Sequence, residues 1–216
     1  MSERQLVGEI VVAEYTTFCA ESYKLHQAPP LGGLVMADSV VGLVYSARTE
    51  GLGPIIRKGK EDNADGEVYN LHPELERTLR TQFTALCVGY QAADGSIKHF
   101  YPDRPPRVHY QCHLLDDEAS YQFTARPDYL RAVVSATDPG IDQALIHLLY
   151  RTYQMRPPDQ VRRDHLLAAT TFLSRLLKGQ YDRLIAILET LEGMLGDGYA
   201  SDGEGEMMRG VGRVEY

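Results

Sequence analysis

The sequence has no tryptophan and only three cysteines among its 216 residues. Cys19, Cys87 and Cys112 are an odd number at wide spacings and form no Cys-x-x-Cys pair, so neither a disulfide framework nor a zinc ribbon is expected. There is no run of the roughly 18 apolar residues that a membrane span requires, and the start MSERQLVGEI lacks the pattern of a signal peptide. We therefore expect a cytoplasmic protein with reduced thiols and no membrane association.

Positive charge is also scarce. The chain has 22 Lys and Arg residues against 30 Asp and Glu residues, which gives a formal net charge of -8 at pH 7. A surface with this average charge repels phosphate backbones, so direct binding of nucleic acid is disfavoured. The densest basic cluster is formed by Arg57, Lys58 and Lys60, and the stretch EDNADGE follows it at once and largely cancels its charge.

The glycine patterns that bind nucleotides or present a nucleophile are missing. A Walker loop needs Gly, four residues and then Gly-Lys-Ser/Thr, whereas Gly53 is followed after five residues by the letters GKE. A carboxylate replaces the hydroxyl, and Pro54 removes an amide donor. No Gly-x-Gly-x-x-Gly fingerprint starts at Gly32 or Gly33, and Gly-x-Ser-x-Gly does not occur. We expect a protein that is not an enzyme and that binds no cofactor.

Short runs rich in Val, Ile and Tyr fill the first part of the chain. LVGEIVVAEY and GLVMADSVVGLVYS are too short between breaks for helices and are typical of strands, with a tight turn at Asp38-Ser39. Glycines inside strand patterns, here Gly8 and Gly42, mark bulges or bends that let a small sheet close on itself. This region therefore favours a barrel over a flat sheet.

A loop and a helix are expected to interrupt this barrel over residues 51–83. Leu71, Leu75 and Leu79 recur every four residues, which predicts a short helix over 72–83. The runs TALCVGYQ and IKHFYP then flank the turn AADGS and predict a hairpin. We expect an α+β protein with a small closed β-barrel over 1–116.

The remainder of the chain is expected to be helical over 117–196. Asp138-Pro139 opens one predicted helix, a second runs from Asp159 to Lys178 with Gly179 as its C-cap, and a third runs from Tyr181 to about Leu195. These three amphipathic helices form a C-terminal bundle that docks on the barrel, on a partner or on a second copy of the chain. Residues 197–216 are glycine-rich, acidic and aperiodic, so a mobile tail is expected there.

Histidines offer the best alternative to a non-catalytic protein. His109 and His113 share one face if HYQCH is a strand, with Cys112 on the opposite face, and His99 lies nearby in sequence. A metal-dependent hydrolase could use this region, although further ligands would have to come from elsewhere in the chain. Histidines satisfied within a barrel wall are the simpler interpretation.

A single-stranded nucleic-acid-binding barrel is a third hypothesis. Small barrels often bind strands through exposed aromatic and basic side chains. The residues best suited to this role, besides the basic cluster 57–60, are Tyr90, Phe100, Tyr101, Arg104, Arg107 and Tyr110. The acidic net charge argues against it.

The segments VGEIVV, PPLGGLVMAD and VVGLVYS resemble the start of the barrel domain shared by HerA-type DNA-translocating ATPases and rotary ATP synthase subunits, called the HAS barrel. PDRPPRVHY is similar to the segment that leads from this barrel toward the motor. The positions that carry the resemblance are Gly8, Gly32, Gly33, Gly42, Pro102, Pro105, Pro106 and Val108. The resemblance covers about the first half of the chain and implies a HAS or OB-like barrel.

The resemblance implies a stand-alone or motorless member of that family, because helices follow the barrel where the motor and its Walker loop would stand. In the DNA-processing members the barrel helps dock a nuclease on the ATPase ring. The implied role is therefore an assembly or adaptor protein that docks onto a HerA-type ring ATPase, a nuclease or related DNA-processing machinery, with a homo-oligomer as a further option. None of the family's ATP-binding residues has a counterpart in this sequence.

Overall fold

The computed structural model describes residues 5–53, 64, 66–158 and 160–207, and it is an α+β structure, as expected. The seven strands are β1 (Leu6–Ala13), β2 (Thr17–Ser22), β3 (Leu34–Ala37), β4 (Val40–Gly51), β5 (Leu79–Gln91), β6 (Ile97–Lys98) and β7 (Gln111–Leu114). The helices are α1 (Glu67–Leu71), α2 (Leu75–Thr78), α3 (Asp117–Phe123), η1 (Pro127–Tyr129), α4 (Leu130–Ser135), α5 (Ile141–Gln154), α6 (Gln160–Leu176) and α7 (Tyr181–Met207).

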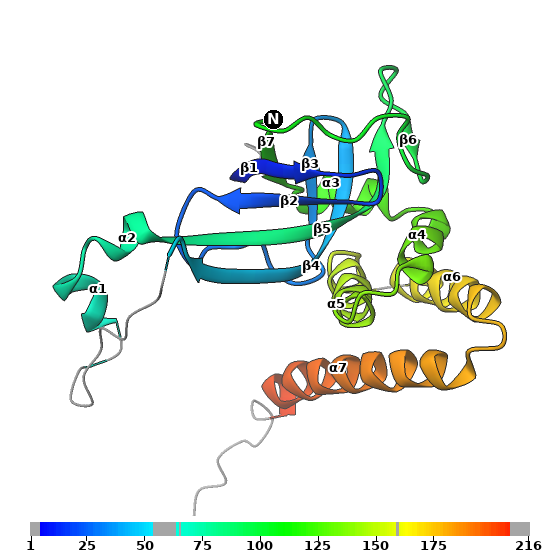
Figure 1. Cartoon of the computed structure of the whole chain (residues 1–216). Helices are drawn as coiled ribbons and strands as arrows, with labels where there is room; N and C mark the ends of the chain where they lie inside the picture. Colours follow the sequence, from blue (N-terminus) through cyan, green and yellow to red (C-terminus); the bar gives the residue numbers. More distant parts are fainter. Residues whose placement is uncertain (1–4, 54–63, 65, 159, 208–216) are drawn as a thin grey trace, which may run out of the picture.

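The strands form one antiparallel sheet whose pairings close into a ring. The order is β2-β1-β7-β3-β4-β5-β6, and a further pairing joins β2 to β5. β6 is therefore attached outside the ring, on β5. The long strands β4 and β5 run on beyond the ring toward α1 and α2, whereas α4 to α7 lie at the opposite side of the molecule (Figure 1).

Local turn chemistry confirms several predictions. Asp38-Ser39 forms a two-residue connection between β3 and β4, with Asp38 at a φ of 56°. The AADGS turn joins β5 to β6, with Gly95 at a φ of 81°. Register shifts fall next to Gly8 in the β1–β7 pairing and next to Gly42 in the β4–β5 pairing. These irregularities bend the strands as a closing sheet requires.

The prediction of a helix over 72–83 holds only for the single turn of α2 and is wrong from Leu79 onward. Helix α2 ends at Thr78, and β5 begins at Leu79. From this point Phe83 and Ala85 alternate with Thr84 and Leu86 between two faces, and β5 pairs with β4 and β2. Pairing on both sides outweighs the four-residue leucine spacing, because the spacing covers only two turns of a helix.

The helices after β7 differ from their predictions in three places. Helices α3 and α4 lie in the segment 117–196 that is expected to be helical, but neither is among the three helices predicted there. Asp116 is the N-cap of α3, and its carboxylate accepts a hydrogen bond from the amide of Ala119 at 2.8 Å. Helix α7 continues to Met207 instead of ending near Leu195, because glycines lower helix propensity without necessarily stopping a helix that is already formed. Residues 208–216 lie outside the described residues.

Two apolar cores organise the molecule. The first contains residues of all six ring strands and therefore fills the ring: Val7, Ile10, Phe18, Ala20, Val35, Ala37, Val40, Val44, Phe83, Ala85, Cys87 and Cys112. The second lies between the helices and the outer face of β3, β4 and β5, to which it is joined through Leu34, Leu43 and Leu86. The parts of β3 to β5 that carry these residues are thus buried on both faces, and the helices pack directly on the ring.

Gly32 marks the point where the ring meets α5. Its φ is +74°, and a β-carbon on it would lie 2.6 Å from the β-carbon of His147 and 2.7 Å from the carbonyl oxygen of Ala144. Only glycine therefore allows this close approach without strain.

Neither a membrane-spanning helix nor a disulfide is present among the described residues. None of their helices is both long enough and apolar enough to cross a bilayer. Cys87 and Cys112 are buried free thiols, and burial raises the pKa of each to about 12. Cys19 is partly exposed.

Candidate docking surface

The three candidate histidines do not form a common site. His99 lies 2.9 Å from the carbonyl oxygen of Phe123 through its Nε2, and His109 lies 2.5 Å from a carboxylate oxygen of Glu9 through its Nδ1. The prediction that His109 and His113 share a strand face is wrong, because His109 has a φ of 67° and precedes β7. Within the described part of the chain, no group of three or more His, Cys, Asp or Glu residues could hold a metal ion.

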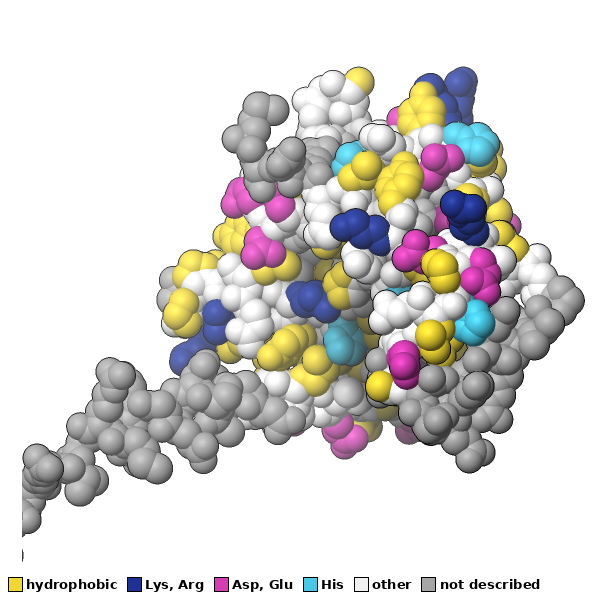
Figure 2. Space-filling model, turned by 90° about the vertical axis from the view of Figure 1, so that its left-hand side faces the viewer, with side chains coloured by type: hydrophobic (Ala, Val, Ile, Leu, Met, Phe, Trp, Pro, Cys, Tyr) yellow, Lys and Arg dark blue, Asp and Glu magenta, His cyan; other side chains and the backbone are white. Residues whose placement is uncertain are grey.

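The aromatic and basic candidates are partly engaged with one another. Tyr90 and Phe100 form an edge-to-face pair at 5.5 Å, and Arg107 donates to the hydroxyl of Tyr110 and pairs with Asp38 at 3.6 Å. Tyr101 and Arg104 are exposed. The described face in Figure 2 intersperses both signs of charge, without a broad basic area. Arg57, Lys58 and Lys60 lie outside the described residues, as does most of the stretch from Gly53 to Glu61.

The residues of the HAS-barrel resemblance occupy different parts of the ring. Gly8 lies in β1, Gly42 in β4, and Gly32 and Gly33 directly before β3. The proline-rich segment crosses from β6 to β7 without regular structure, with Pro102 and Pro106 buried, Pro105 half-buried and Val108 exposed.

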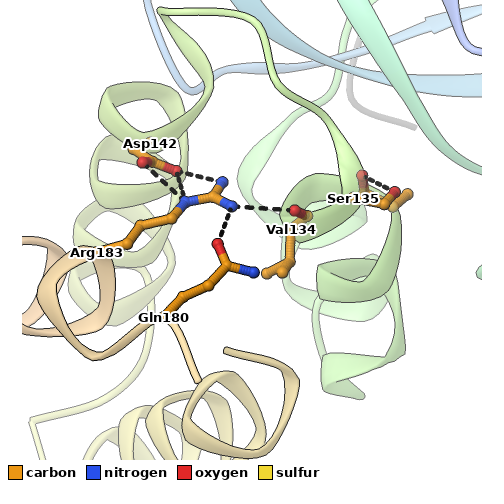
Figure 3. Close-up of polar contacts among 6 residues, drawn as sticks. Val134, Ser135, Asp142, Gln180 and Arg183 are labelled. Atoms are coloured by element: carbon orange, nitrogen blue, oxygen red, sulfur yellow. Dashed lines mark hydrogen bonds and ion pairs between the residues drawn. The ribbon is translucent and has the colours of Figure 1, made fainter. Parts of the chain in front are cut away.

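The hairpin of α6 and α7 forms the outermost layer of the molecule, separated from the sheet by α4 and α5 (Figure 1). Arg183 fixes α7 in this position. Its guanidinium donates to both carboxylate oxygens of Asp142 on α5, at distances of 2.7 to 3.1 Å, and to the carbonyl of Val134 on α4 at 3.2 Å (Figure 3). A bidentate pair of this kind holds one orientation, so α7 is oriented as well as packed.

A mostly apolar groove runs between α6 and α7, with a volume of about 420 Å³. Leu188, Leu191 and Leu195 form its α7 side, and Leu166 and Thr170 form its α6 side. Glu192 lies at the groove with its side chain exposed. We call this surface the α6–α7 groove.

The apolar stripe of α7 continues beyond the groove. Leu184, Ile187 and Leu191 are buried in the interhelical core, whereas Ile185 is 50% exposed and Tyr181 is 66% exposed. Residues spaced by three, four and seven positions lie on one side of a helix, which places Tyr181, Ile185 and Leu188 together. The apolar face of α7 is therefore wider than the face that the other described residues cover.

Negative charge borders this stripe. Across residues 181–196 the only basic residue is Arg183, which is committed to Asp142. Asp182, Glu189 and Glu192 are exposed and make no ion pair with other described residues. The surface therefore combines exposed apolar side chains with unneutralised carboxylates.

Sequence reasoning predicted the leucine stripes of both helices but not which side of each remains open. Periodicity marks the apolar side chains, whereas coverage depends on where α4 and α5 lie. In comparisons with known proteins, no protein-family model matches the chain and no curated protein matches it significantly.

Proposed function

We propose that the chain is a non-catalytic assembly protein, in which a HAS or OB-like barrel carries a helical layer that docks onto a HerA-type ring ATPase of a DNA-processing machine. Two features support the barrel. The ring closes through the β2–β5 pairing, and the glycines that carry the family resemblance stand at register shifts or tight contacts. The ring interior is filled by side chains, which suits a structural role for the strands.

The α6–α7 groove carries the docking part of the proposal. It is mostly apolar and lies on the outermost helices, and the exposed residues Ile185 and Tyr181 continue the apolar stripe of α7 beyond it. Two helices in contact form a groove that suits a third helix, as in helix-in-groove recognition. Because Asp182, Glu189 and Glu192 border the stripe, the fitting occupant is an amphipathic helix of the ATPase with Lys or Arg beside its apolar face.

The experiment that tests this proposal is direct binding of the purified chain to a purified hexameric ATPase of this type from the same organism. Native mass spectrometry gives the stoichiometry, and interferometry gives the dissociation constant. We expect Ile185→Asp to weaken binding by about tenfold or more, because a carboxylate would be buried without a partner in the interface. Glu192→Lys should weaken it less, and more strongly at low ionic strength.

Leu167→Asp is the matched control. Leu167 is an exposed leucine on α6, 66% accessible, and it lies outside the α6–α7 groove. This variant should bind as the wild type does. Absence of any complex, or equal losses for Ile185→Asp and Leu167→Asp, would refute docking through the groove, and self-association blocked by Ile185→Asp would replace the ATPase with a second copy of the chain.

A further inference from the structure

A second pocket lies away from the α6–α7 groove, between α3 and the start of α6. Its volume is about 320 Å³, and its walls are largely small or apolar side chains: Ala125, Pro127, Val161, Ala168 and Ala169. Tyr121, Arg156 and His165 supply its other surfaces, with Asp164 at α6. Ala125 and Ala168 are exposed, so the pocket opens to solvent beside them.

Arg156 is a buried cation in this pocket, with only 3% of its surface exposed. Its guanidinium donates to the carbonyl of Thr152 at 2.6 Å and to the hydroxyl of Thr124 at 3.2 Å. No carboxylate among the described residues forms an ion pair with it. Buried charges are normally paired with an opposite charge, and a guanidinium has five N–H donors. Two neutral acceptors therefore leave the positive charge without a counter-charge and some of the N–H groups without an acceptor.

The surroundings hold the guanidinium in one orientation. The ring of Tyr121 lies under it, with 4.6 Å between the guanidinium carbon and the ring centroid. Tyr129 is fully buried, and its hydroxyl has no hydrogen-bond partner among the described residues. This hydroxyl does not line the pocket. The buried guanidinium of Arg156, which lines the pocket without a counter-charge among the described residues, indicates that a partner is missing.

The charge of the pocket selects the class of partner. Burial, with a contribution from Arg156, lowers the pKa of His165 to about 4, so this histidine is neutral at pH 7. Among the described lining residues, the pocket therefore offers one buried positive charge, Arg156, and one exposed carboxylate, Asp164, which accepts a hydrogen bond from Gln160 at 2.6 Å. A phosphate dianion would need more cationic groups or backbone amides, whereas one planar guanidinium matches one carboxylate. The alanine, proline and valine walls suit a short aliphatic group attached to that carboxylate.

We infer that this pocket, which we call the Arg156 pocket, binds a small monocarboxylate whose carboxylate pairs with Arg156 and whose apolar tail lies against Ala125, Val161 and Ala168. Such a ligand would supply the buried cation with the counter-charge that the described chain does not. The inference is independent of the proposed docking function, because the Arg156 pocket shares no lining residue with the α6–α7 groove.

The test is a titration of alanine-methyl-labelled protein with butanoate, followed by NMR of Ala125 and Ala168. Butanamide, which has the same shape but no charge, and inorganic phosphate are titrated in parallel. Butanoate has few heavy atoms, so a dissociation constant of about 1–10 mM is expected. We expect saturable shifts of both methyl groups with butanoate, and no saturable shift with butanamide.

Two variants separate binding from folding. Arg156→Lys keeps the charge but loses the planar fork, and it should weaken butanoate binding by about tenfold or more. Because replacement of a buried arginine also disturbs packing, Ala168→Leu provides the second variant. It narrows the exposed mouth without touching Arg156, so the fold should persist while butanoate binding is lost.

Three results would overturn the inference. One is the absence of saturable shifts with butanoate up to about 50 mM, well above the expected constant. Another is equal binding of butanamide, which would make the pocket a general apolar cavity. The third is tighter binding of phosphate than of butanoate, which would assign the Arg156 pocket to a different anion.

Discussion

The ring interior and the outer helical layer differ in how completely their apolar side chains are covered. Inside the ring, twelve residues drawn from six strands are buried, and Phe18 and Phe83 are 1% exposed. In the outer layer, α7 buries Leu184 and Ile187 but leaves Ile185 and Tyr181 at the surface. The apolar side chains inside the ring are thus buried within one chain, whereas part of the apolar surface of the outer layer stays exposed. This contrast supports the proposal that the ring is structural and that the outer helices bind a partner.

The contact between the two regions is where a single change should have the largest effect. Gly32→Ala would force alanine into a left-handed conformation and place its β-carbon 2.7 Å from the backbone oxygen of Ala144 on α5. We expect the free energy of unfolding to fall by about 3–5 kcal/mol, from backbone strain and overpacking together. Urea unfolding followed by circular dichroism measures this change.

Gly95→Ala is the control for the strain alone. Gly95 also has a positive φ, +81°, but a β-carbon there would meet nothing within 4 Å. Gly95→Ala should lower the free energy of unfolding by about 1–2 kcal/mol. Equal losses for the two variants would mean that α5 does not press on the ring at Gly32.

Truncation of the shared core tests whether the two regions fold as one unit. Leu145 of α5 is fully buried in the core that also contains Leu43 and Leu86 of the sheet. Leu145→Ala should lower the free energy of unfolding by about 2–5 kcal/mol and shift one common transition of the strands and helices. Two separate transitions, with the sheet unaffected, would show that the helices are an independent domain.

Much of the ring could be predicted from sequence, because its signals are local. The Asp38-Ser39 turn, the Gly95 turn and the bulges at Gly8 and Gly42 each depend on the conformational preferences of a few adjacent residues. The error at Leu79 has a different origin. Whether that residue continues a helix or begins β5 depends on pairing with β4 and β2, which are far away in sequence.

The Arg156 pocket could not be predicted for a similar reason. In the sequence, Arg156-Pro157-Pro158 indicates only the end of a helix. The importance of Arg156 arises from Thr124 and Tyr121, more than thirty residues away, which enclose its guanidinium. Helix α3, which carries Tyr121, lies in the segment expected to be helical, but the sequence predicts no separate helix at these residues.

A decrease in pH should lower the free energy of unfolding through the protonation of His165 on α6. In the unfolded chain this histidine binds a proton near pH 6.5, whereas in the folded chain its pKa is about 4 because it is buried. The unfolded state therefore binds more protons between these values. The free energy of unfolding should fall as the pH decreases from about 6.5 to about 4, by at most about 1.4 kcal/mol per pH unit.

His165→Gln should reduce this slope, since glutamine does not titrate. Part of the slope will remain, because burial also lowers the pKa of His99. Urea unfolding of both proteins at several pH values between 4 and 7 measures the difference. Parallel curves for the wild type and the variant would contradict a neutral, buried His165.

The smallest change in stability is expected from the ion pair that orients α7. Where in the molecule this change occurs is more informative than how large it is. The side chains of Arg183 and Asp142 are 25% and 37% exposed, so solvent screens much of their attraction. Arg183→Met should therefore lower the free energy of unfolding by only about 1 kcal/mol. Because this pair joins the outer helix to α5, hydrogen exchange should accelerate in α7 and remain unchanged in β1 and β2. Arg80→Met is the matched control: Arg80 and Glu50 are similarly exposed, but they join β4 to β5 on the sheet side. If Arg183→Met accelerated exchange in the ring and in α7 alike, the outer helices would be coupled to the ring as tightly as the core is, and the proposed division between a structural ring and a separate outer layer would fail.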